Sequence, residues 1–340
     1  MKLARRAVVA TAVIALAAPA AATTATAAAA ESARNTAGAV PAAIKVTATI
    51  PVGAAPTGIA TNPKTNTVYV ANRDDGTVSV IRGRTRKVIA TIPGANGDGI
   101  AVNPRTDRIY LTGGTVISGR TNKVVATIRG VGGTAIAVNP RTNTIYATDA
   151  TSGTVSVASG RAKRVVATIP VGIVPAGVAV NPRTNKVYVA IQGTREDKDN
   201  TVAVISGRTR KVVNTITVGQ APVAVAVNPR TNTIYVANDF DGTLSVIRGR
   251  TSKVVATIPS FAAPAGVAVN PRTSTVYVTN EAANTVSVIS GRTNKVVATV
   301  AVGILPFGVA VNRKTSTIYV TNFGDHTVSV LRPRVSGPMR

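Results

Sequence analysis

One phrase returns seven times along this chain and limits the fold more than any other feature. Residues 228–238 read NPRTNTIYVAN, and each of the other copies also begins with asparagine. These anchor asparagines, each followed seven residues later by one of the seven tyrosines, are Asn62, Asn103, Asn139, Asn181, Asn228, Asn270 and Asn312. Because units of about 40–45 residues rich in short β segments are typical of propeller blades, the sequence predicts one β-propeller.

Each unit contains four short apolar segments. In one unit they are residues 265–270, 275–280, 285–290 and 295–300, which we call strands A, B, C and D. Val, Ile, Thr and Tyr dominate them, as is typical of β-strands, and no helical period is present. Small apolar residues on both sides of the alternation predict that neighbouring blades cover each blade on both faces.

The two ends of the repeated region predict how the ring closes. Residues 45–50 (KVTATI) have the pattern of a strand D that no strand A, B or C precedes. Residues 327–334 end the last unit after strand C. We therefore expect an all-β propeller of seven four-stranded antiparallel blades over residues 45–334. Its N-terminal strand D would complete the last blade and remove an open edge.

The opening of the repeated phrase is turn chemistry. Asn-Pro starts a tight turn, because proline presets φ at the second position. Asn or Asp four residues after the anchor tolerates the left-handed conformation that such hairpins need. These residues are Asn66, Asp107, Asn143, Asn185 and Asn232. The arginine in the phrase is not required by the turn.

The N-terminal segment is expected to direct export. MKLARR is basic, residues 7–20 are apolar but short for a membrane span, and small residues follow. We interpret residues 1–30 as a signal peptide, with a retained membrane anchor as the alternative, and the export route, general or twin-arginine, stays open. Residues 31–44 are expected to be a flexible lead-in and 335–340 a tail. The mature chain would be extracytoplasmic and without a transmembrane span.

Four short motifs carry a family resemblance. YVTN stands at 277–280 and 319–322, and YVAN at 69–72 and 235–238. With these motifs the region 45–334 resembles the YVTN-repeat β-propeller family. The resemblance implies a seven-bladed, exported or cell-surface binding module with no shared catalytic set. The chain differs from the family's acidic turns by having Gly-Arg and Pro-Arg-Thr.

Basic and acidic residues are expected at opposite ends of the predicted ring. The formal net charge is +26. In a four-stranded meander the A–B and C–D turns share one end, and these turns hold 29 of the 39 Lys and Arg residues, opposed there only by Asp107. We call this end the basic face. The B–C and D–A loops hold 11 of the 13 acids, and we call that the acidic end.

Clustered charge of one sign is typical of binding to anionic partners. We therefore expect the basic face to bind an anionic cell-wall polymer, an acidic polysaccharide or a nucleic acid. Aromatic residues do not alternate with the arginines, so base stacking is not indicated. The alternative is a solubilising surface that also protects strand edges. The predicted contacts are Arg84, Arg120, Arg141, Arg161, Arg183, Arg208, Arg230, Arg250, Arg272 and Arg292.

The acidic end offers a second set of candidates. We expect Asn72, Asn238, Asn280 and Asn322, which end strand B, to form a channel mouth. Asp239 and Asp241 are the candidates for a calcium site, although an ordinary Asp-Gly turn explains them as well, and no metal is predicted. Residues 190–200 form the longest insertion and are interpreted as a specificity loop or a tolerated surface loop.

Catalytic residues are sparse. His326 is the single histidine, there is no cysteine, and no Ser-His-Asp set or metal-ligating histidine pair is present. The absence of cysteine also excludes disulfides. We therefore predict a monomeric, non-catalytic binding module without a cofactor. The alternative is an enzyme, or a scaffold for a protein partner, that acts at the acidic end.

Overall fold

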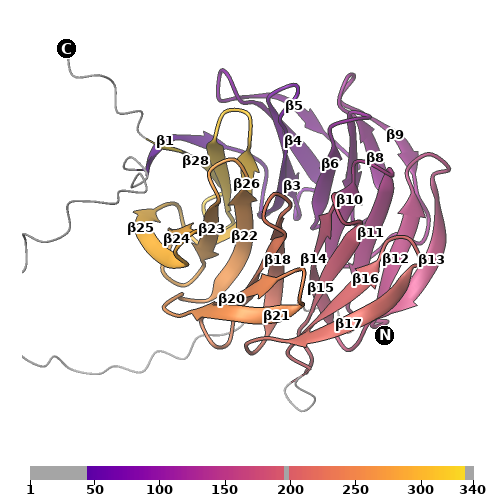
Figure 1. Cartoon of the computed structure of the whole chain (residues 1–340). Helices are drawn as coiled ribbons and strands as arrows, with labels where there is room; N and C mark the ends of the chain where they lie inside the picture. Colours follow the sequence, from indigo (N-terminus) through magenta and orange to yellow (C-terminus); the bar gives the residue numbers. More distant parts are fainter. Residues whose placement is uncertain (1–43, 195–198, 334–340) are drawn as a thin grey trace, which may run out of the picture. The chain divides into compact units, whose positions relative to one another are not determined.

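The computed structural model describes residues 44–194 and 199–333, whose regular secondary structure is entirely β-strand. The 28 strands form seven antiparallel sheets of four strands each. Figure 1 shows how the strands are arranged in space. Each sheet is one blade, and its strands pair in the order A, B, C, D. The prediction of a seven-bladed propeller is therefore confirmed. The predicted signal peptide, the tail and almost all of the lead-in lie outside the described residues.

The strand bounds follow the repeats. Blade 1 is β2 (Pro56–Asn62), β3 (Thr67–Asn72), β4 (Thr77–Arg82) and β5 (Lys87–Ile92). Blade 2 is β6 (Ile100–Asn103), β7 (Arg108–Leu111), β8 (Thr115–Ser118) and β9 (Lys123–Thr127). Blade 3 is β10 (Ala135–Asn139), β11 (Thr144–Asp149), β12 (Thr154–Ser159) and β13 (Arg164–Pro170). Blade 4 is β14 (Pro175–Asn181), β15 (Lys186–Ile191), β16 (Thr201–Ser206) and β17 (Lys211–Thr217).

The remaining blades have the same plan. Blade 5 is β18 (Pro222–Asn228), β19 (Thr233–Asn238), β20 (Thr243–Arg248) and β21 (Lys253–Ile258). Blade 6 is β22 (Pro264–Asn270), β23 (Thr275–Asn280), β24 (Thr285–Ser290) and β25 (Lys295–Ala301). Blade 7 is β26 (Pro306–Asn312), β27 (Thr317–Asn322), β28 (Thr327–Pro333) and β1 (Ile44–Pro51). In blade 6 the predicted strands agree with these bounds to within one residue.

Blade 7 is closed by the N-terminal strand, as predicted. β1 pairs antiparallel with β28, from Ile44 opposite Pro333 to Pro51 opposite Thr327. Its register shifts between Val46 and Ala48, and the outer strands of the other six blades carry a shift against strand C as well. β1 is therefore a strand D by register as well as by sequence, although it begins at Ile44, one residue before the predicted start.

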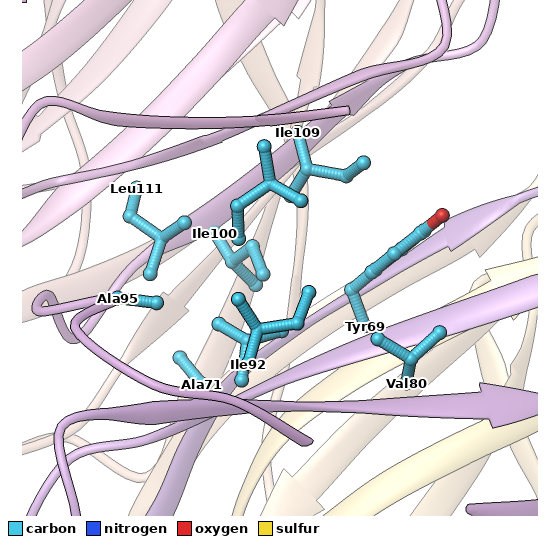
Figure 2. Packing of buried hydrophobic residues seen from close by; sticks show 10 residues of the cluster. Tyr69, Ala71, Val80, Ile92, Ala95, Ile100, Ile109 and Leu111 are labelled. Carbon is cyan, nitrogen blue, oxygen red and sulfur yellow. The ribbon is translucent and has the colours of Figure 1, made fainter. Parts of the chain in front are cut away.

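The hydrophobic core lies between the blades. Strand A of each blade contacts strand A of the next, and β26 contacts β2, so these strands form the inner ring. Figure 2 shows one inter-blade cluster, in which Tyr69, Val80 and Ile92 of blade 1 pack with Ile100 and Ile109 of blade 2. All seven tyrosines are buried in such contacts. Because each core needs two blades, the stability of one blade depends on its neighbours.

The prediction that neighbouring blades cover each blade on both faces does not hold at the outer strands. Strands B and C are buried, but the valines of strand D are partly or largely exposed, and the isoleucine near the end of most D strands, such as Ile92, is buried. Val124 and Val125 are both 42% exposed, and Val213 is 53% exposed. The outermost strand of a blade has a neighbour on one side only, so similar residue types occupy two different environments.

The buried tyrosines predict a loss of stability at high pH. Burial raises the pKa of all seven phenols, that of Tyr277 to about 12. In the unfolded chain the pKa is about 10. The buried, neutral phenols therefore contribute fully to the stability of the fold below about pH 10. This contribution is lost as the pH rises towards the pKa values of the phenols in the folded chain. We expect phenolate absorbance and loss of the β circular dichroism signal to appear together in an alkaline titration. Phenols that titrate near pH 10 in a chain that is still folded would contradict this.

Candidate anion-binding face

The anchor asparagines join each A–B turn to the next blade. Asn139 is fully buried; its Oδ1 accepts the Arg141 N–H at 3.0 Å and its Nδ2 donates to Asn185 Oδ1 of the next blade at 2.7 Å. The other anchors repeat both bonds. Their inter-blade acceptors are Asp107, Asn143, Asn232, Ser274, Ser316 and, closing the ring, Asn66. The repeated Asn therefore serves both the turn and the assembly of blades.

The acceptor residues have the conformation that the sequence predicts. Asn66, Asp107, Asn143, Asn185 and Asn232 have φ between 53° and 55°. Ser274 and Ser316 occupy the same position in blades 6 and 7, with φ of 57° and 53°. Sequence reasoning identified the first five as turn residues but missed their bonds to the neighbouring blade. The signal was the pairing of two polar residues, four positions apart, in every unit.

The Gly-Arg step of the C–D turns brings the two sets of turns together. In blade 3 the Gly160 N–H donates to Asn143 O at 2.9 Å, and five other blades have the same bond. A Cβ on Gly160 would lie 2.6 Å from Tyr110 Oη and 2.7 Å from Asn143 Oδ1, so only glycine fits. The arginine that follows in sequence, Arg161, is exposed. The A–B and C–D turns therefore form one continuous face.

All ten predicted arginines are exposed on this face. Arg183 donates to Pro229 O at 3.3 Å and Arg272 to Arg313 O at 3.5 Å, each a backbone carbonyl of the next blade. Within residues 44–194 and 199–333 the one ion pair joins Arg73 to Asp74 at the acidic end. Asp107, the one acid described on the basic face, accepts the Asn62 amide at 2.7 Å. The described acids therefore leave the arginines of this face without a carboxylate partner.

Two hollows lie on the basic face. One, of about 480 Å³, is lined by Pro63, Lys64, Arg272, Arg313 and Lys314, which belong to the A–B turns of blades 1, 6 and 7. The other, of about 430 Å³, lies between blades 5 and 6 and is lined in part by Arg230, Arg248 and Arg250. Arg248 was not among the predicted contacts. Both hollows present arginine side chains, which suit bidentate contact with phosphate or carboxylate groups.

The four asparagines predicted to form a channel mouth lie inside their own hairpins. Asn72 is 1% exposed, and its amide donates to Thr77 Oγ1 and Ser79 Oγ, both at 2.9 Å. Asn238, Asn280 and Asn322 repeat this arrangement. Their amide groups hydrogen-bond the end of strand B to strand C, so these amides are not free to contact a ligand. The sequence showed where these residues end strand B but not which way they turn.

Four described carboxylates of the acidic end, those of Asp75, Asp199, Asp241 and Asp325, hold the backbone of the adjoining D–A loops. Asp241 Oδ2 accepts the Gln220 N–H at 2.6 Å, and Asp75 and Asp325 make the equivalent bonds. Burial raises the pKa of Asp239 and of Glu281, and the charge of Asp239 adds to the rise at Glu281. Among the residues that the structure describes, no three acidic or histidine side chains gather as a metal site. Asp241 therefore has a structural role.

His326 also has a structural role. Its Nδ1 accepts the Ala55 N–H at 3.0 Å, across the junction between blades 7 and 1. Asn200 and Asn284 make the same bond to Ala221 and Leu305 at two other junctions. His326 has a φ of 55°, as the turn requires at this position. The imidazole therefore replaces an asparagine in a repeated loop contact.

Comparisons with known proteins give the fold. No family model matches the chain, and no curated protein matches it. Many solved structures do, among them a chain titled Kuenenia stuttgartiensis hydrazine synthase. It is 17% identical with a TM-score of 0.72, and the match covers 83% of this chain and 96% of that one. The likeness is one of fold. It supports the propeller architecture, and the YVTN-repeat family stays a prediction.

No helix able to cross a membrane is present in residues 44–194 and 199–333. Those residues consist of strands and the turns between them.

Proposed function

We propose that this chain is an exported, non-catalytic binding propeller of the YVTN-repeat type whose basic face holds an anionic polymer or surface. One observation carries the proposal: ten exposed arginines lie on one end of the ring without a described carboxylate partner, while the acids gather at the other end. Like charges on one face repel each other, so the arrangement lowers stability unless an anionic partner compensates it.

The turn geometry supports a binding role for the arginines. Asn and Gly make the buried hydrogen bonds and the close contacts of the turns, whereas Arg183 and Arg272 add only long, exposed bonds to carbonyls of the next blade, so the fold depends little on arginine there. Export is supported by the N-terminal sequence. If the chain is exported, protein recovered from the envelope or medium of expressing cells should lack its first residues on N-terminal sequencing.

A non-catalytic role is supported by the absence of cysteine and the turn contact of His326.

The test replaces three A–B arginines that lie outside the hollow between blades 5 and 6. Arg141→Ser, Arg183→Ser and Arg272→Ser together should leave the melting temperature nearly unchanged. Affinity for heparin or polyphosphate should fall on the order of a hundredfold, at about 1 kcal/mol for each of the three charges. The slope of log K against log salt should decrease by about two, because fewer counterions are released. Titrations at several salt concentrations measure both quantities.

The matched control changes the other end of the ring. Asp74→Ser, Asp239→Ser and Glu281→Ser together alter the same number of charged residues at the acidic end. This variant should bind the polyanion with the parent's salt slope. If the arginine variant also retains the parent's affinity and slope, the basic face is a solubilising surface and the proposal is wrong.

A further inference from the structure

We propose that the hollow between blades 5 and 6 is a discrete subsite for one tetrahedral oxyanion, a phosphate or sulfate group, with the part of the polymer that carries it. The inference rests on the proposed function and assigns it a specific site. The hollow has a volume of about 430 Å³. Ligand clefts in proteins span about 300–1,000 Å³, so it accommodates more than the oxyanion itself.

Three arginines of blade 5 line the hollow from three different segments. Arg230 lies in the A–B turn, Arg248 ends β20, and Arg250 lies in the C–D turn. All three are exposed, and within the described residues none of their guanidinium groups has a hydrogen bond or an ion pair. Guanidinium groups that converge on one hollow can bind several oxygens of the same oxyanion, each through two parallel N–H bonds.

Blade 5 differs from its siblings at these positions. The residue that ends strand C is serine in blades 2, 3, 4 and 6, where it is Ser118, Ser159, Ser206 and Ser290. Blades 1 and 7 have arginine at the equivalent position, as Arg82 and as Arg332, the last but one residue of β28, but they have lysine in the A–B turn, as Lys64 and Lys314. Blade 5 alone has arginine at all three positions. Since the turns do not need these arginines, this combination is best explained by a ligand.

The rest of the lining complements an oxyanion. Thr231, Thr233 and, from the C–D turn of blade 6, Asn294 add polar side chains to the lining, and the two threonine hydroxyl groups hydrogen-bond to each other at 2.9 Å. Val246 and Val255 add apolar surface to the lining, beside the arginines. Asp107, the one described acid on this face, is in blade 2 and not in the lining.

The experiment compares two variants that remove the same charge from the same position in different blades. Arg248→Ser introduces the residue found in four sibling blades, so it should fold. Arg82→Ser is the control in blade 1. Isothermal titration at constant ionic strength uses inorganic pyrophosphate and, separately, inorganic sulfate. The parent should show one saturable site for at least one of them. Arg248→Ser should weaken it about tenfold to a hundredfold, and Arg82→Ser less than about twofold.

The outcomes separate this subsite from the proposed function. Equal effects of the two variants, or no saturable binding of either small anion while heparin still binds, would overturn the proposal of a subsite. The proposal that the basic face binds a polymer would stand. The parent could instead bind a small anion in a saturable way but neither heparin nor polyphosphate. If Arg248→Ser alone then loses the small anion, the subsite is supported and the proposal of polymer binding is wrong. If Arg248→Ser melts below the parent, Arg248→Gln with Arg82→Gln as its control repeats the comparison.

Discussion

A chain that begins at Val52 is expected to melt on the order of 10 °C below one that begins at Pro41, or to aggregate. The shorter chain lacks β1, so β28 loses its outer partner and exposes an unpaired edge. It also loses Ile44 and Ile50, which are 9% and 4% exposed and contribute to two inter-blade clusters. Burial of two such side chains contributes about 3–6 kcal/mol. Scanning calorimetry of the two chains measures the difference.

The chain that begins at Pro41 serves as the control because it keeps β1 complete. The chain from Pro41 should melt like the full chain, since the closure of blade 7 depends on residues from Ile44 onwards. A chain from Val52 that melts at the same temperature and stays monomeric would show that the ring does not need its N-terminal strand. Our account of the closure would then be wrong.

Replacing one anchor asparagine is expected to cost about 2–6 kcal/mol of unfolding free energy. Asn139→Leu keeps the number and branching of the side-chain heavy atoms but removes the acceptor of the Arg141 N–H and the donor to Asn185 Oδ1. Both groups then lie near a buried position without their partner, and each unpaired group costs about 1–3 kcal/mol. Urea denaturation should show a lower midpoint with an unchanged m value.

Asn185→Ser is the matched control on the other side of the same bond. Blades 6 and 7 have Ser274 and Ser316 at this position, and each hydroxyl accepts the amide of the preceding anchor, at 3.5 Å and 3.2 Å. The serine variant should therefore lose less than about 1.5 kcal/mol. If the two variants unfold at the same urea concentration, the inter-blade bond does not contribute as we infer.

Much of the fold could be predicted from the sequence because propeller blades are local. Strand bounds depend on turns, and turns depend on the φ preferences of a few residue types such as Asn, Pro and Gly. The segment 265–270 was predicted as strand A and is observed as β22 (Pro264–Asn270). The end of the ring on which each turn lies also follows from chain order, because strands alternate in direction. The exposed arginines of the basic face could therefore be placed without a structure.

Side-chain direction could not be predicted in the same way. Asn72 ends a strand B and Asn139 ends a strand A, and nothing in either motif shows that Asn72 bonds within its own blade while Asn139 reaches the next. The hollow beside Arg248 also needs residues of two blades to form. These features depend on how neighbouring blades approach each other, which no single repeat contains.

The sequence by itself determined the number of blades, their strands, the closing role of residues 45–50 and the sign of charge at each end. Local turn preferences and a fixed repeat are sufficient for these features. Only the tertiary structure decided which valines are exposed on strand D, which asparagines join blades, and where three arginines converge. The physical reason is that the core and the hollow of this protein lie between blades, so burial and hydrogen bonding there belong to pairs of repeats.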